Sequence, residues 1–72
     1  MSNYTIHAQL KEAGIPQTER NELENLLDGL KAAKPEDKAT LMQRGIDWMG
    51  RNAKNLGSLA QVIGPWFGWK VA

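Results

Sequence analysis

Cysteine is absent from this chain of 72 residues, and histidine occurs only once. The absence of cysteine excludes disulfides, thiolate zinc sites and cysteine nucleophiles. The single imidazole, His7, has no acidic residue near it in sequence, whereas nucleophilic catalysis needs a base that a third group orients. We therefore expect His7 to be an exposed or half-buried helix side chain, and we expect a protein that is not an enzyme.

Motifs for metals, phosphates and small substrates are also missing. Two acidic pairs, Glu19 with Glu22 and Glu36 with Asp37, offer only hard oxygen ligands, and no calcium-loop spacing surrounds a glycine. The glycines near the C-terminus are spaced as helix stops and not as a phosphate-binding loop. We predict no cofactor, no metal and no small-molecule substrate.

Long hydrophobic runs are lacking as well. A helix that spans a bilayer needs about 20 consecutive apolar residues, and no segment of the chain comes close to that length. The N-terminus lacks the basic and apolar regions of a signal peptide, so we expect a cytoplasmic protein. The length corresponds to a single domain, 1–72. Domains below roughly 70–80 residues usually need extra stabilisation from disulfides, a metal or a partner. Because we expect neither disulfides nor a metal here, good helix packing or oligomerisation must stabilise the fold.

Charge and aromatic residues are distributed unevenly. Residues 1–37 contain four basic and seven acidic residues (net −3), whereas residues 38–72 contain five basic residues and one acid (net +4). All three tryptophans and the phenylalanine also lie in the second half. The chain is thus acidic first, then basic and aromatic.

Apolar spacing predicts two helices in the first half. Residues 3–13 fit both the alternation of a strand and the face of a helix, and their composition leads us to expect a helix that ends at Gly14. Residues 17–33 carry four leucines at i, i+3, i+4 and i+7, which predicts an amphipathic helix. Thr18 is a candidate N-cap for that helix.

A third helix is expected over residues 35–55, with Pro35 in its first turn. One apolar stripe runs from Ala39 to Ala53, and a second strip beside it contains Trp48, so two packing neighbours are expected. Gly57 should end this helix, and Ser58 with Gln61 forms a candidate capping box for a fourth.

Gly64-Pro65 should break the fourth helix, because proline lacks the N–H and disfavours helical geometry in the residue before it. The predicted fold is therefore all-α, a small antiparallel bundle of three to four short helices. Its predicted core contains the following apolar residues: Ile6, Leu10, Leu23, Leu26, Leu27, Leu30, Met42, Ile46, Met49, Leu59, Val62 and Ile63.

Two surfaces are candidates for function. Small cores cannot bury three tryptophans, a phenylalanine and a leucine stripe together, so an aromatic interaction surface is expected. We assign to it Trp48, Trp66, Phe67, Trp69 and Lys70. The second candidate is a basic face on the third helix, formed by Arg44, Arg51 and Lys54. Asp47 interrupts this face, which makes a nucleic-acid partner the weaker interpretation.

The order of features over about residues 10–69 resembles the C-terminal helical part of AbiTii-type bacterial phage-defence proteins. The resemblance is carried by Gly14-Ile15-Pro16, an acidic leucine-rich helix, Asp47-Trp48-Met49-Gly50 and a final helix containing glycine and aromatic residues. It implies a small helical interaction module linked to bacterial or phage conflict, and it brings no catalytic residue.

The function predicted from these features is a non-enzymatic protein-interaction module that self-associates through its aromatic C-terminal surface. In a symmetric dimer, the acidic second helix of one copy could lie beside the basic third helix of the other. Two alternatives stay open: a peripheral membrane-binding or membrane-perturbing protein, and a small nucleic-acid-binding regulator.

Overall fold

The computed structural model describes residues 3–68, which fold as a bundle of helices. The elements are α1 (Asn3–Glu12), α2 (Gln17–Ala32), α3 (Pro35–Leu56), α4 (Leu59–Ile63) and a 3-10 helix, η1 (Gly64–Phe67). No strand occurs within residues 3–68, so the predicted all-α class is confirmed and the ambiguous first segment is a helix.

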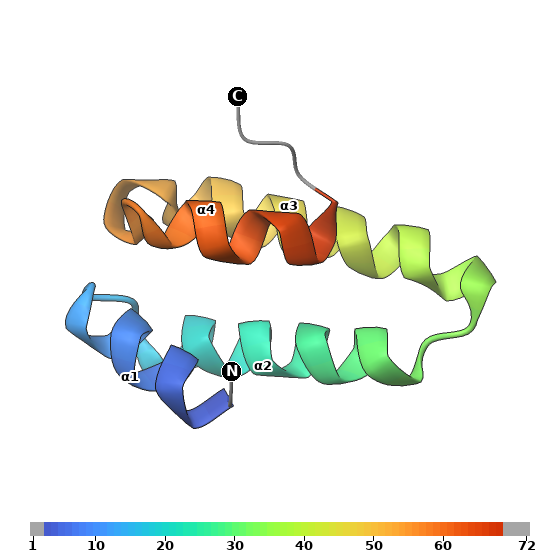
Figure 1. The fold of residues 1–72 in the computed structure, drawn as a ribbon, viewed down its shortest axis with the longest axis horizontal. Coiled ribbons are helices and arrows are strands. Elements are labelled where there is room, and N and C mark those ends of the chain that lie inside the picture. Colours follow the sequence, from blue (N-terminus) through green and yellow to red (C-terminus); the bar gives the residue numbers. More distant parts are fainter. Residues whose placement is uncertain (1–2, 69–72) are drawn as a thin grey trace.

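Two helical hairpins form the bundle. α1 folds back on α2, and α4 with η1 folds back along α3, while α2 and α3 are joined by a short turn (Figure 1). α3 is the central element, because it packs against α2 on one side and against α4 and η1 on another. This agrees with the two apolar strips on its surface.

Prolines set the starts of α2 and α3. Pro16 and Lys34 occupy the N-cap positions with extended backbone, and Pro35 is the first residue of α3, as predicted. Extended geometry at Lys34 follows from the clash between a proline ring and the residue before it. The prediction for Thr18 is wrong, because α2 begins at Gln17 and Thr18 lies inside its first turn.

Glycines end α1 and α3. Gly14 has φ of +89° and Gly57 has φ of +54°, values that side chains with a Cβ rarely adopt. The predicted capping box after Gly57 is wrong: Ser58 has helical backbone angles and its side chain makes no cap hydrogen bond. Turn bonds to the carbonyls of Gly57 and Ser58 start the next helix instead.

The predicted break at Gly64-Pro65 is a change of helix type. α4 ends at Ile63, and the chain continues as η1 from Gly64 to Phe67. Gly68 then ends η1 in the left-handed region, with its N–H bonded to the carbonyls of Gly64 and Pro65. Hereafter "the arm" means α4 and η1 together, residues 59–67.

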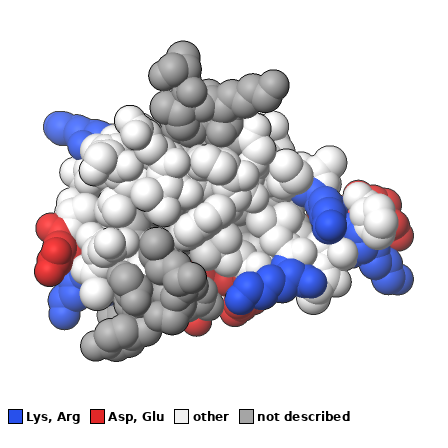
Figure 2. All heavy atoms as spheres, viewed as in Figure 1, with Lys and Arg blue, Asp and Glu red and all other residues white. Residues whose placement is uncertain are grey.

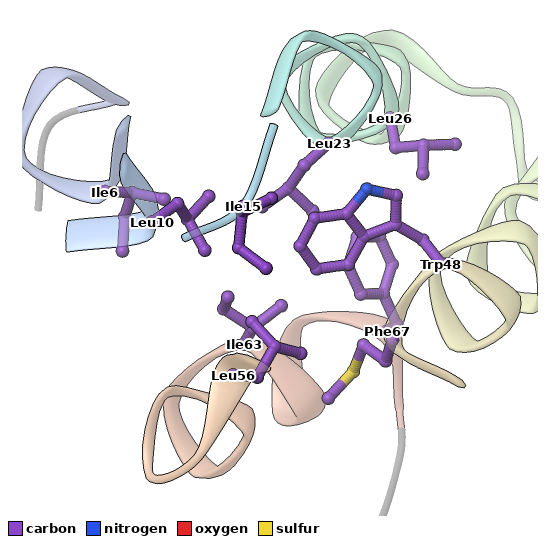
Figure 3. Close-up of a cluster of buried hydrophobic side chains, with 10 residues drawn as sticks. Ile6, Leu10, Ile15, Leu23, Leu26, Trp48, Leu56, Ile63 and Phe67 are labelled. Atoms are coloured by element: carbon purple, nitrogen blue, oxygen red, sulfur yellow. The ribbon is translucent and has the colours of Figure 1, made fainter. Parts of the chain in front are cut away.

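The core lies between the two hairpins, where α1 and α2 face α3 and the arm (Figure 3). Its ten buried apolar residues are Ile6, Leu10, Ile15, Leu23, Leu26, Trp48, Met49, Leu56, Ile63 and Phe67. Six of these belong to the predicted core, and Ile15, Trp48, Leu56 and Phe67 were not expected in it. Of the other predicted core residues, five are half-buried: Leu27, Leu30, Met42, Ile46 and Leu59. Val62 is 38% exposed, so its assignment to the core is wrong.

Candidate interaction surface

Trp48 was expected on the aromatic surface, but it is fully buried. Its side chain projects from α3 toward Leu23 and Leu26 of α2, and it has 0% exposure (Figure 3). The indole Nε1 donates a hydrogen bond to the backbone carbonyl of Glu19 at 2.8 Å. This bond satisfies the polar edge of the ring, so the whole side chain can be buried without an unpaired donor. Trp48 therefore joins α2 to α3.

Phe67 is also a core residue and not a surface one, with 0% exposure. Its ring lies against Gly45 of α3, where an added Cβ would be only 2.0 Å from a ring atom. The missing side chain at Gly45 thus makes the space that the phenyl ring fills. A glycine in the middle of a strongly periodic helix was the sequence signal for this close approach.

Of the other residues assigned to the aromatic surface, only Trp66 lies within the described part of the chain. Trp66 is half-buried on η1 and packs against the edge of the core. Trp69 and Lys70 lie outside the described residues. The structure therefore removes Trp48 and Phe67 from the predicted aromatic surface. We use "the ridge" for the partly exposed apolar residues of the arm, Leu59, Val62 and Trp66.

The arm carries no charge. No Asp, Glu, Lys or Arg occurs between Lys54 and Lys70. On the face that Figure 2 shows, the charged side chains gather toward the ends and the lower edge, and much of the centre is uncharged. Val62 is the exposed large apolar residue of the arm, and Leu59 and Trp66 beside it are half-buried, so an uncharged and partly apolar surface is left for a partner to cover.

The predicted basic face is divided by a contact within the chain. Arg51 donates to both carboxylate oxygens of Glu22 at 2.8 Å and to Glu19 at 3.4 Å. Hydrogen bonds to Glu22 and then to Glu19 raise the pKa of the Arg51 guanidinium above its ordinary value. The acidic second helix and basic third helix thus pair within one chain. The basic face assigned to Arg44, Arg51 and Lys54 is not a continuous free surface.

The other members of that face are exposed. Arg44 and Lys54 are exposed side chains of α3, and neither forms an ion pair within residues 3–68. Asp47 lies between them and accepts a hydrogen bond from Gln43 at 3.1 Å. The face that remains is thus of mixed charge.

His7 links α1 to α2. Its Nε2 lies 2.5 Å from a carboxylate oxygen of Glu24, and its side chain is 28% exposed, which agrees with the half-buried side chain expected. Arg20 donates to the carbonyl of Ile15 at the turn between the two helices. No local sequence pattern predicts the His7–Glu24 contact, because the two residues are 17 positions apart.

A shallow apolar groove lies between α3 and α4. Its lining residues are Ile46, Met49, Gly50 and Ala53 of α3 and Ala60 of α4, and its volume is about 170 Å³. Gly50 differs from Gly45, since a Cβ added at Gly50 would meet no atom within 4 Å. The groove adjoins the arm through Ala60, whereas Val62 lies on another flank of α4, so the ridge and the groove are two separate candidate contact surfaces.

Comparisons with known proteins add no further assignment. No family model matches the chain, and neither the curated proteins nor the solved structures contain a match.

Within residues 3–68, no three or more His, Asp or Glu side chains come together as metal ligands. No helix in the same part of the chain is both long enough and apolar enough to cross a membrane.

Proposed function

We propose that this chain is a non-enzymatic protein-interaction module that self-associates, with the arm as part of the contact. The observation that carries the proposal is the uncharged arm, whose apolar ridge of Leu59, Val62 and Trp66 is left partly exposed. Tryptophan is enriched among the residues that dominate binding energy at protein interfaces, which gives Trp66 a natural role in such a contact.

The small size of the domain supports the same proposal. A domain of about 60–70 residues buries only about 60% of the surface of its unfolded chain, so added burial in a partner is a large gain. The chain has no cysteine to provide a disulfide. Covering the apolar ridge with a second copy would supply the stabilisation that larger domains obtain from a larger core.

Charging the ridge should weaken self-association. Val62→Glu places a carboxylate on an exposed ridge position, so it should spare the fold but leave a desolvated charge in any contact that covers it. We expect the dissociation constant to rise at least about tenfold, which corresponds to about 1.4 kcal/mol. Light scattering after size exclusion, over a dilution series, measures the mass relative to the 8.0 kDa chain.

Gln61→Glu is the matched control, because Gln61 is an exposed neighbour in the same short helix. It adds the same charge, and we expect it to leave the dissociation constant within about twofold of the original. A wild-type protein that stays at 8.0 kDa at every concentration would contradict self-association. Equal effects of the two variants would show that charge itself, and not coverage of the ridge, controls the mass.

A membrane surface is the second candidate partner. The observation that favours it is the charge-free run from Asn55 to Trp69, which is followed by Lys70. Aromatic residues and lysine together suit the interface of an anionic bilayer. Vesicles of anionic phospholipid test this second candidate: a blue shift of tryptophan emission supports membrane binding, and an unchanged spectrum contradicts it.

A role in bacterial or phage conflict stays a prediction that rests on the resemblance over residues 10–69. Nucleic-acid binding loses support, since Arg51 is engaged by Glu19 and Glu22. A phosphate-binding role would then fall to the exposed Arg44 and Lys54, with Asp47 between them.

A further inference from the structure

Gly50 is unexplained by the packing of a single chain. It lies in the interior of the 22-residue helix α3, where glycine is less stable than alanine, and a Cβ would meet nothing within 4 Å. Gly45 and Gly29, by contrast, each face a side chain of this chain, Phe67 and Leu41 respectively. Gly50 instead is an exposed residue that lines the apolar groove. A close approach from outside the chain would account for it.

Two opposite charges border the groove on its solvent side. With 100° per residue, Asp47 and Lys54 lie about 60° and about 40° around α3 from Gly50, both in the same direction. Asp47 is three residues before Gly50, and Lys54 is three residues after Arg51. The two charges are therefore placed symmetrically about the Gly50–Arg51 peptide, each about 5 Å from it along the helix axis. Neither forms an ion pair within residues 3–68.

This arrangement is self-complementary under a two-fold axis. If α3 of a second copy runs antiparallel across the groove, with the axis at the Gly50–Arg51 peptide, Asp47 of each copy faces Lys54 of the other. Both ion pairs lie on the same side of the interface. The small groove residues Gly50 and Ala53 allow the two helices to approach at the short end of the usual 8–10 Å range.

We propose that the groove between α3 and α4 is the central contact of an antiparallel two-fold dimer, closed by two Asp47–Lys54 ion pairs. This inference rests on the proposed self-association and names its surface and its register. The arm contributes Ala60 to this interface, whereas the ridge residue Val62 lies about 160° around α4 from Ala60, on another flank of the arm.

Charge reversal tests the register. Asp47→Lys alone and Lys54→Asp alone each place two like-charge pairs in the interface, so each should raise the dissociation constant about tenfold at low ionic strength. The double variant Asp47→Lys/Lys54→Asp restores both opposite-charge pairs and should return the dissociation constant to within about twofold of the wild type. Arg44→Glu is the matched control, because Arg44 is an exposed residue of α3 outside the groove, and it should have little effect.

Gly50→Gln tests the close approach independently of charge. Its side chain would occupy the open space beside Gly50 into which the second copy of α3 must pack, so the dissociation constant should rise more than tenfold. In dilute solution the same variant should melt at a higher temperature than the wild type, because glutamine favours helix over glycine and nothing blocks it. Opposite effects on association and melting distinguish a lost contact from a damaged fold.

The outcomes separate this inference from the broader proposal. A wild-type dimer that persists in Gly50→Gln and in both single charge reversals would overturn the groove as the interface, while self-association through another surface would stand. Failure of the double variant to recover would overturn the antiparallel register. A wild-type protein that is monomeric at all concentrations would overturn both proposals.

Discussion

Trp48→Ala is expected to lower the free energy of unfolding by about 3–5 kcal/mol, the usual cost of removing a large buried aromatic side chain. A domain of this length has about 4–11 kcal/mol in total, at 0.05–0.15 kcal/mol per residue. The substitution would thus remove a large part of the stability or all of it. The indole is fully buried and also bonds to the Glu19 carbonyl, so both packing and a hydrogen bond between α2 and α3 are lost.

Urea unfolding followed by circular dichroism at 222 nm measures this loss without relying on tryptophan emission. Trp66→Ala is the matched control, because it makes the same substitution at a half-buried position on η1. We expect it to cost less than half as much as Trp48→Ala. Equal losses at the two positions would contradict the assignment of Trp48 to the core and Trp66 to its edge.

Trp48→Phe separates the hydrogen bond from the packing. It keeps an aromatic ring in the core but removes the Nε1–H that bonds to the Glu19 carbonyl at 2.8 Å. A loss of about 1–3 kcal/mol is expected from the smaller ring and the missing bond together. A loss as large as that of Trp48→Ala would mean that the hydrogen bond, and not burial of the ring, dominates the contribution of Trp48.

The helices could be predicted from sequence because local signals determine them. The spacing of Leu23, Leu26, Leu27 and Leu30 defines one face of α2, and Pro35 and Gly57 mark the ends of α3 through backbone geometry alone. Such signals act within one or two turns. They require no knowledge of which helices become neighbours.

Burial of the aromatic residues could not be predicted in the same way, because it depends on contacts between distant segments. The buried Trp48 donates its N–H to an acceptor 29 positions away, the Glu19 carbonyl. Phe67 is buried since Gly45 leaves space for its ring. Composition suggested that a small core would leave these rings outside, but the core instead leaves out Val62 and parts of Leu27 and Leu30.

The charge asymmetry between the two halves predicted a contact between an acidic and a basic helix, but the structure forms this contact within one chain. It predicted that the acidic second helix would lie beside a basic third helix, and the expectation was a contact between two copies. Arg51 makes this contact with Glu19 and Glu22 inside one chain. Sequence charge patterns indicate complementary surfaces, whereas loop length decides whether they meet in one chain. The two-residue turn between α2 and α3 brings the helices side by side.

Gly45→Ala is expected to destabilise the protein by about 3 kcal/mol, at the upper end of the usual cost of overpacking a core. The new Cβ would lie 2.0–2.4 Å from three atoms of the Phe67 ring, so the ring must withdraw by more than 1 Å. Phe67 is fully buried and ends the arm, and moving it shifts the arm relative to α3. Urea unfolding of the monomer in dilute solution measures the loss.

Gly50→Ala is the matched control in the same helix, five residues away. It makes the same substitution where nothing lies within 4 Å, and it should stabilise the monomer by about 0.5–1 kcal/mol. The two variants are therefore expected to change stability in opposite directions. Phe67→Leu should also cost less in the Gly45→Ala background than in the wild type, because a smaller side chain relieves the clash. If the two costs are equal, Gly45 and Phe67 are not coupled, and the arm is held to α3 by other contacts.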